Sequence, residues 1–167
     1  GIISGSTRLI KDGNGTLALP AGNTYTGGTV LAGGKIRLDH ASGTATNASN
    51  ALGPSGLISF TGGALQFTAN NTVDYSSRFD STSTQAYAFD TNGQTVTLAS
   101  LPAGTGTLTK SGNGTLQIVN ATTRFANATV GSTVINGGTL ALAVANPNVI
   151  ASQAVISGAG TLSIEPS

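Results

Sequence analysis

The chain has 167 residues, of which only 8% are charged, with seven Lys and Arg against six Asp and Glu. This length suits a single domain with one continuous core. The near-zero net charge argues against the basic surface that nucleic acid requires, and no apolar run approaches the roughly 20 residues of a membrane-spanning helix. Cysteine is absent, which excludes a disulfide framework and a thiolate metal site.

Short β-branched and leucine-rich runs follow one another along the chain, and nearly every gap between them contains Gly, Asn, Pro or Ser. No long window has the apolar spacing of an amphipathic helix. We therefore predict an all-β chain. In chain order, the predicted strands are 8–10, 16–19, 29–31, 35–38, 57–60, 64–67, 86–89, 95–98, 107–110, 115–119, 133–135, 139–144, 154–157 and 161–164.

An internal repeat makes the architecture more specific. The sequence KDGNGTL at 11–17 returns as KSGNGTL at 110–116, an offset of 99 residues. Residues 23–38 align with 127–142 at an offset of 104, which pairs Gly33-Gly34 with Gly137-Gly138.

Within each repeat, a strand, a glycine corner and a second strand follow one another at the spacing of one solenoid coil. Coils of this kind stack, because no single turn can bury its apolar face alone. We predict one β-solenoid domain over residues 1–167, with about 7–8 coils. Its repeat units are 8–38 and 107–142, linked by 43–106 with a polar loop near 74–84. In the first repeat the residues expected to point into the core are Leu17, Leu19, Val30, Ile36 and Leu38.

Cofactor and metal motifs are weak. GNGTLA at 13–18 matches a dinucleotide fingerprint in letters only, because Pro20 and Gly22 prevent the helix that such a site needs. His40 is the single histidine and has no second His nearby, so a metal site is poorly supported. We expect no cofactor and no metal.

One set of residues leaves catalysis open. Asp74, Tyr75, Arg78 and Asp80 lie close in sequence, and paired carboxylates can act as acid and base in glycoside hydrolysis. The alternative is a polar loop with local Asx turns and a surface ion pair. We name no catalytic residue.

Aromatic residues leave carbohydrate binding open as well. Phe67 and Phe89 end strands and are expected to stack in the core or to cap a coil. Tyr75 and Tyr87, if exposed, could stack on sugar rings.

The repeat resembles the passenger-associated transport repeat of bacterial autotransporters. The resemblance rests on KDGNGTLA at 11–18 and KSGNGTLQ at 110–117, followed in the first copy by NTYTGGTV at 23–30 and GGKIRL at 33–38. The second copy has NATVGS at 127–132 where the first has NTYTGG. The resemblance implies a right-handed parallel β-helix that is exported to the cell surface, where such repeats support secretion and folding of a passenger.

We therefore expect a non-enzymatic structural module of an exported bacterial surface protein, either a stalk or a filament subunit. The chain begins at Gly1 rather than Met, which suggests a processed product or an excised fragment. Neither end has a capping sequence, and ISGSTRL at 3–9 resembles ISGAGTL at 156–162. Copies are expected to stack head to tail, unless covalently neighbouring repeats supply the flanking coils. A carbohydrate-binding adhesin and a polysaccharide-cleaving β-helix enzyme remain as alternatives.

Overall fold

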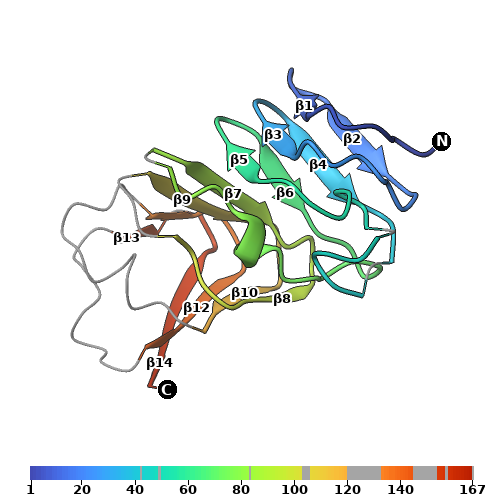
Figure 1. Cartoon of the computed structure of the whole chain (residues 1–167). Helices are drawn as coiled ribbons and strands as arrows, with labels where there is room; N and C mark the ends of the chain where they lie inside the picture. The colour runs from blue at the N-terminus through green and yellow to red at the C-terminus, as the bar shows by residue number, and fades with distance from the viewer. Residues whose placement is uncertain are drawn as a thin grey trace.

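The computed structural model describes residues 1–41, 43–48, 50–82, 84–102, 106–119, 133–144, 154–156 and 158–166. These residues form fourteen strands and one 3₁₀ turn, η1 (Ser76–Arg78), and contain no α-helix (Figure 1). Every predicted strand is present, with ends shifted by at most two residues. The strands are β1 (Leu9–Lys11), β2 (Thr16–Leu19), β3 (Thr29–Leu31), β4 (Lys35–Leu38), β5 (Ile58–Phe60), β6 (Ala64–Gln66), β7 (Ala86–Asp90), β8 (Thr95–Leu98), β9 (Thr107–Ser111), β10 (Thr115–Ile118), β11 (Thr133–Ile135), β12 (Thr139–Val144), β13 (Ala154–Ile156) and β14 (Thr161–Pro166).

All strand pairs are parallel, so the protein is a parallel β-solenoid. Its largest sheet has seven strands in the order β13-β11-β9-β7-β6-β4-β2. The chain therefore completes about six turns, slightly fewer than the seven or eight predicted. The prediction was too high because some coils are long: Thr16 pairs with Lys35, but Lys35 pairs with Ala64.

Each coil has three sides. The two strands of a coil occupy one pair of sides in the first half of the chain and a different pair in the second half. Side A is the sheet β1-β3-β5, side B is the seven-stranded sheet, and side C is the sheet β14-β12-β10-β8. In the first three coils, side C consists of return segments instead of strands, where the Thr24 amide donates to the Ile3 carbonyl at 2.9 Å.

The change occurs where β6, the second strand of its coil, pairs with β7, the first strand of the next. As a result the two sequence repeats occupy different sides. In the first repeat, the KxGxGTL corner joins side A to side B, whereas in the second it joins side B to side C. The offset between the two sequence repeats is therefore not a whole number of turns.

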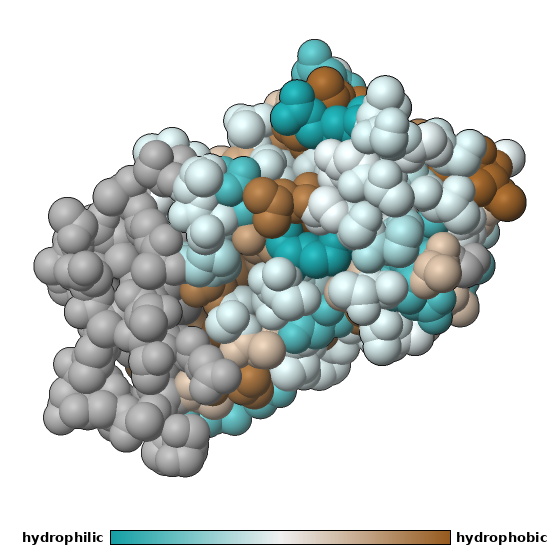
Figure 2. Space-filling model, viewed as in Figure 1, coloured by the Kyte–Doolittle hydropathy of each residue, from teal (hydrophilic) through white to brown (hydrophobic). Residues whose placement is uncertain are grey.

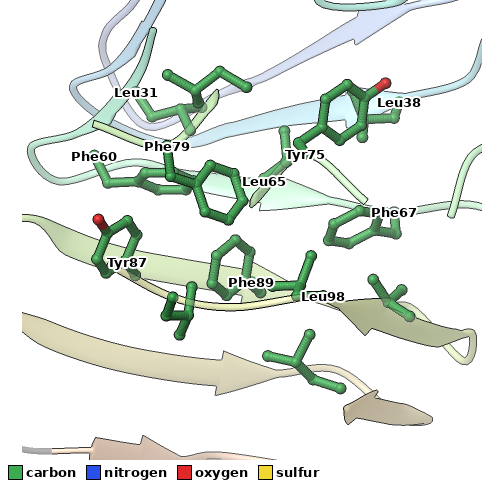
Figure 3. Close-up of a cluster of buried hydrophobic side chains, with 14 of the residues drawn as sticks. Leu31, Leu38, Phe60, Leu65, Phe67, Tyr75, Phe79, Tyr87, Phe89 and Leu98 are labelled. Carbon is green, nitrogen blue, oxygen red and sulfur yellow. The ribbon is translucent and has the colours of Figure 1, made fainter. Parts of the chain in front are cut away.

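The core is a continuous column of aliphatic and aromatic side chains along the axis (Figure 3). Around the change of sides, the Phe60 ring lies 5.4 Å from Phe79, 5.2 Å from Tyr87 and 5.3 Å from Phe89, centroid to centroid. Phe67 is also fully buried and lies 6.4 Å from Phe89. The prediction that Phe67 and Phe89 stack in the core is confirmed.

The strand alternation corrects one core prediction. Leu19, Ile36 and Leu38 are buried, and Leu17 packs against the core from a partly buried position. Val30 is only half-buried, because Thr29 and Leu31 face inward in β3 and a strand alternates its faces at every residue.

The two similar heptapeptides also occupy different places. Residues 3–9 run along the return side into β1, whereas residues 158–160 precede β14, which follows β13 in the chain. Their similarity in letters therefore carries no structural equivalence.

The outer surface shows scattered rather than clustered apolar residues on the face seen in Figure 2. The large apolar residues that are exposed are Ile2, Ile10, Leu57 and Ile164. Within the described ranges, no helix is long and apolar enough to span a bilayer.

We predict that Phe60→Ala lowers the free energy of unfolding by about 3–5 kcal/mol, because it leaves a cavity among three neighbouring rings. Chemical denaturation followed by circular dichroism measures this change. Ile10→Ala is the control, since Ile10 is 57% exposed and its truncation should change stability by less than about 0.5 kcal/mol. Equal effects of the two substitutions would contradict the packing described here.

Candidate functional site

A buried lysine lies at the same point of both sequence repeats, at the last inward position before the glycine corner. The Lys11 ammonium donates hydrogen bonds to the carbonyls of Asp12 at 2.7 Å, Gly13 at 2.8 Å and Gly33 at 3.0 Å. The first two carbonyls belong to its own corner, and the third belongs to the corner of the next coil. We call this arrangement the lysine clamp.

The second repeat reproduces the clamp. The Lys110 ammonium donates to the carbonyls of Ser111 at 3.0 Å, Gly112 at 2.8 Å and Gly137 at 3.0 Å. Lys110 is fully buried, and Lys11, in the first coil, is 8% exposed. Each lysine clamp thus ties two consecutive coils together at their corners.

The clamp satisfies a buried charge without an acidic hydrogen-bond partner. Burial lowers the pKa of Lys110, and the negative charge of Asp90 partly offsets this effect. Three carbonyl dipoles replace the water that an ammonium normally binds. The aliphatic stem meanwhile fills core space, as lysine stems do at apolar surfaces.

The corner of the next coil has glycine where any other residue would be strained and would collide with the backbone of the preceding corner. Gly34 and Gly138 have φ of 59° and 63°, which favours glycine. A Cβ at Gly34 would lie 2.7 Å from the Lys11 Nζ, and one at Gly138 would lie 2.9 Å from the Lys110 Nζ. The lysine of one coil therefore packs closely against the Gly-Gly pair of the next.

Sequence reasoning did not single out these lysines. The available signal was a lysine at the same position of both repeats in a chain that has few charges. Alternation marks that position as inward, and an inward lysine predicts a satisfied ammonium.

The two carboxylates of the polar loop accept hydrogen bonds from the loop itself and from neighbouring coils. Asp74 accepts hydrogen bonds from the backbone amides of Ser76 and Ala99, at 2.8 and 2.9 Å. Asp80 accepts from the Thr82 amide and from the hydroxyls of Thr82 and Ser59. The Asx turns predicted for this loop are confirmed.

Arg78, on η1, is buried, so the predicted surface ion pair is wrong. All five of its N–H groups donate to backbone carbonyls of the return segment below: Nε to Gly56, Nη1 to Ala45 and Gly53, and Nη2 to Leu52 and Ser55, at 2.6 to 3.0 Å. Burial lowers the pKa of Arg78, with the Tyr25 and Tyr75 phenols acting in the opposite direction. Arg78 is a structural anchor for residues 45–56.

Tyr75 and Tyr87 are not exposed, which corrects their interpretation as a sugar-stacking platform. Tyr75 is fully buried and donates to the Asn50 side-chain oxygen at 2.8 Å. Tyr87 is 2% exposed and donates to the Asp80 carbonyl at 2.7 Å. Both rings lie among the buried side chains of Figure 3.

The side chains of the candidate catalytic set, Asp74, Tyr75, Arg78 and Asp80, therefore form hydrogen bonds that stabilise the solenoid. A general acid for glycoside cleavage needs a carboxyl group whose pKa is raised. The hydrogen bonds from Thr82 and Ser59 instead hold the pKa of Asp80 below its ordinary value.

No metal or nucleotide site emerges elsewhere in the described part of the chain. His40 is half-buried after β4, and no three His, Asp or Glu residues gather there as possible metal ligands. GNGTLA at 13–18 runs from a corner into β2 rather than into a helix.

A second missed interaction lies at the change of sides. Asp90, at the end of β7, accepts hydrogen bonds from Lys35 of β4 at 2.6 Å and from Gln66 of β6 at 2.9 Å. Burial would raise the pKa of Asp90, but the hydrogen bonds from Lys35 and Gln66 lower it below the ordinary value. Asp90 thus links the early coils to the later ones across side B.

These features define a class: a parallel β-solenoid whose repeats are pairs of coils joined by a buried lysine. The model of the passenger-associated transport repeat matches residues 9–38 and 108–142, the two segments that contain the lysine clamps. These two segments, 65 of the 167 residues, therefore match this repeat.

A curated relative points the same way. The adhesin BmaC autotransporter of Brucella suis biovar 1 (strain 1330) is 34% identical in an alignment of 147 positions, and the alignment covers 83% of this chain. The match covers only 4% of that much longer protein. No solved structure matches significantly.

We predict that Lys110→Met, which keeps the stem but removes the ammonium, lowers the free energy of unfolding by about 2–4 kcal/mol. The reason is that three buried carbonyls lose a charged donor. Denaturant unfolding measures the change, with exposed Arg8→Met as the matched control for losing a positive charge. Unchanged or higher stability of Lys110→Met would show that burial of the ammonium costs more than its hydrogen bonds contribute.

Arg78→Lys tests the anchor. A lysine has at most three donors, so at least two of the five carbonyls lose their partner, and we expect a loss of about 2–4 kcal/mol. Limited proteolysis should show faster cleavage within residues 43–57. The control is Arg37→Lys, whose exposed side chain pairs with Asp39 and should change little. If cleavage in this segment is no faster than in the control, Arg78 does not anchor it.

Proposed function

We propose that this chain is a non-enzymatic structural module of an exported bacterial surface protein, placed at the cell surface or outside it. Two matches to the passenger-associated transport repeat and similarity to an autotransporter adhesin support this location. The observation that carries the structural role is the lysine clamp. It occurs once in each repeat, and it joins a coil to its successor.

The proposed role is to provide length and rigidity. In a solenoid, each coil contacts only its neighbours, so links between consecutive coils determine how well the stack holds together. We call the stack of coils the shaft. A rigid shaft of this kind serves as a stalk. Right-handed coiling, the usual hand of parallel crossover connections, is part of the proposal.

The ends of the shaft favour addition of further coils. β1 and β2 end their sheets on one side, and β13 and β14 end theirs on the other, so among the described residues each has one strand edge with no paired strand. Exposed edges pair readily with other strands. Within the proposal, they are joined either by other copies in a head-to-tail filament or by flanking coils of a longer surface protein.

Adhesion is a second candidate, favoured by the name of the relative. In that case the return segments would carry the binding surface. A glycan site built on Tyr75 or Tyr87 is not part of this candidate, because both rings are buried.

Sedimentation velocity at rising protein concentration, with electron microscopy of the same samples, tests the filament form. We expect elongated particles whose length increases with concentration. If the protein is still monomeric at the highest concentration, the filament form of the proposal is wrong and only the stalk form remains. Polysaccharide breakdown that is lost in Asp80→Asn would contradict the non-enzymatic role itself.

A further inference from the structure

The two copies of the GxG corner differ in their surroundings. A Cβ added to Gly112 or Gly114 would meet the backbone of the preceding coil at Asn92 or Gln94. A Cβ added to the equivalent Gly13 or Gly15 would meet no described atom within 4 Å. The first corner thus has the same glycines as the second, but no described residue of this chain lies below it.

Gly15 is the more informative of these positions. Its φ lies outside the left-handed region, whereas its counterpart Gly114 has φ of 88°. Neither space nor backbone conformation within this chain requires glycine at 15. A coil stacked below it, as residues 91–94 stack below Gly114, would bring backbone close to this position and leave little room for a side chain.

The last coil has features that suit a coil stacked below the first corner. Its corner contains Gly158-Ala-Gly-Thr161-Leu162, a third example of the GxGTL pattern, and Gly158 has φ of 66° against 71° for Gly13. Four residues separate β13 from β14, as four separate β1 from β2. The strand pair at one end therefore has the same spacing as the pair at the other.

The side-chain columns also continue across such a junction. Thr95, Thr115, Thr139 and Thr161 are in register on side C, and Thr16 begins β2 in the same way. With Thr161 opposite Thr16, Leu162 would lie over Leu17 and Ile164 over Leu19. Ile164 is 40% exposed and Leu17 only partly buried, so this pairing would cover apolar surface.

We propose that β13 and β14 of a second copy pair with β1 and β2, with Thr161 opposite Thr16. This inference rests on the proposed filament and specifies its interface. β13 lies on side B and β1 on side A, so each added copy turns by one side of the three-sided coil. The interface is heterologous and does not close, which produces a linear assembly.

Gly15→Ala tests the surface of the first coil on which the second copy would stack. We expect the folded chain to keep its stability, because the added methyl group meets open space, and association to weaken at least tenfold in sedimentation. The matched control is Gly114→Ala, where the methyl group would collide with the Gln94 carbonyl inside the chain. That control should lower the unfolding midpoint. Unchanged association of Gly15→Ala would overturn the proposed contact.

Disulfide trapping tests the register, and the absence of native cysteine makes the readout clean. In-register Cα atoms of paired strands lie about 4.8 Å apart, within disulfide range. We expect the double variant Thr16→Cys with Thr161→Cys to form covalent chains on mild oxidation. Thr16→Cys with Ser163→Cys is the control, displaced by two residues to roughly 8 Å and therefore expected to cross-link far less.

The outcomes separate the two proposals. If the wild-type chain associates but the displaced pair cross-links as well as the in-register pair, this interface is wrong and the filament stands. If the wild-type chain stays monomeric and neither pair cross-links, the interface and the filament both fail, and the stalk remains.

Discussion

The structure depends on how a solenoid satisfies backbone carbonyls at places where the chain leaves its strands. Strand carbonyls bond to the coils above and below, but corners and return segments lack that regular ladder. In this structure, buried cationic side chains donate hydrogen bonds to these carbonyls. Lys11, Lys110 and Arg78 together bond carbonyls at two corners and along one return segment, and none has a carboxylate among its hydrogen-bond partners. Three of only seven basic residues are used in this way.

This use of charge explains why a sequence repeat need not coincide with a turn. A lysine clamp requires only one corner and the Gly-Gly corner stacked on it. It can form at the edge between sides A and B or at the edge between B and C, and the chain contains one of each. Asp90, Gln66 and Lys35 then hold side B together where the strands change sides.

The strands, the all-β class and the solenoid could be predicted from the sequence, because they depend on local alternation and on turn residues. Most of the inward residues of the first repeat followed from the same rule, apart from Val30. The change of sides between β6 and β7 could not be predicted, since it depends on how long return segments fold across the coil. The roles of Arg78 and Tyr75 were hidden for a similar reason: polar letters in a loop do not reveal that the loop packs inward over other carbonyls. The lysine clamp was visible in outline, as a repeated lysine, but its partners come from the following coil.

The one-side displacement between the two repeats affects what a longer shaft of this kind can present. Loops that leave equivalent points of successive repeats do not emerge along a single line. They are distributed around the axis, so binding segments carried by different repeats would face different directions. A surface protein built in this way could contact targets around its whole circumference without any bend or hinge in the shaft.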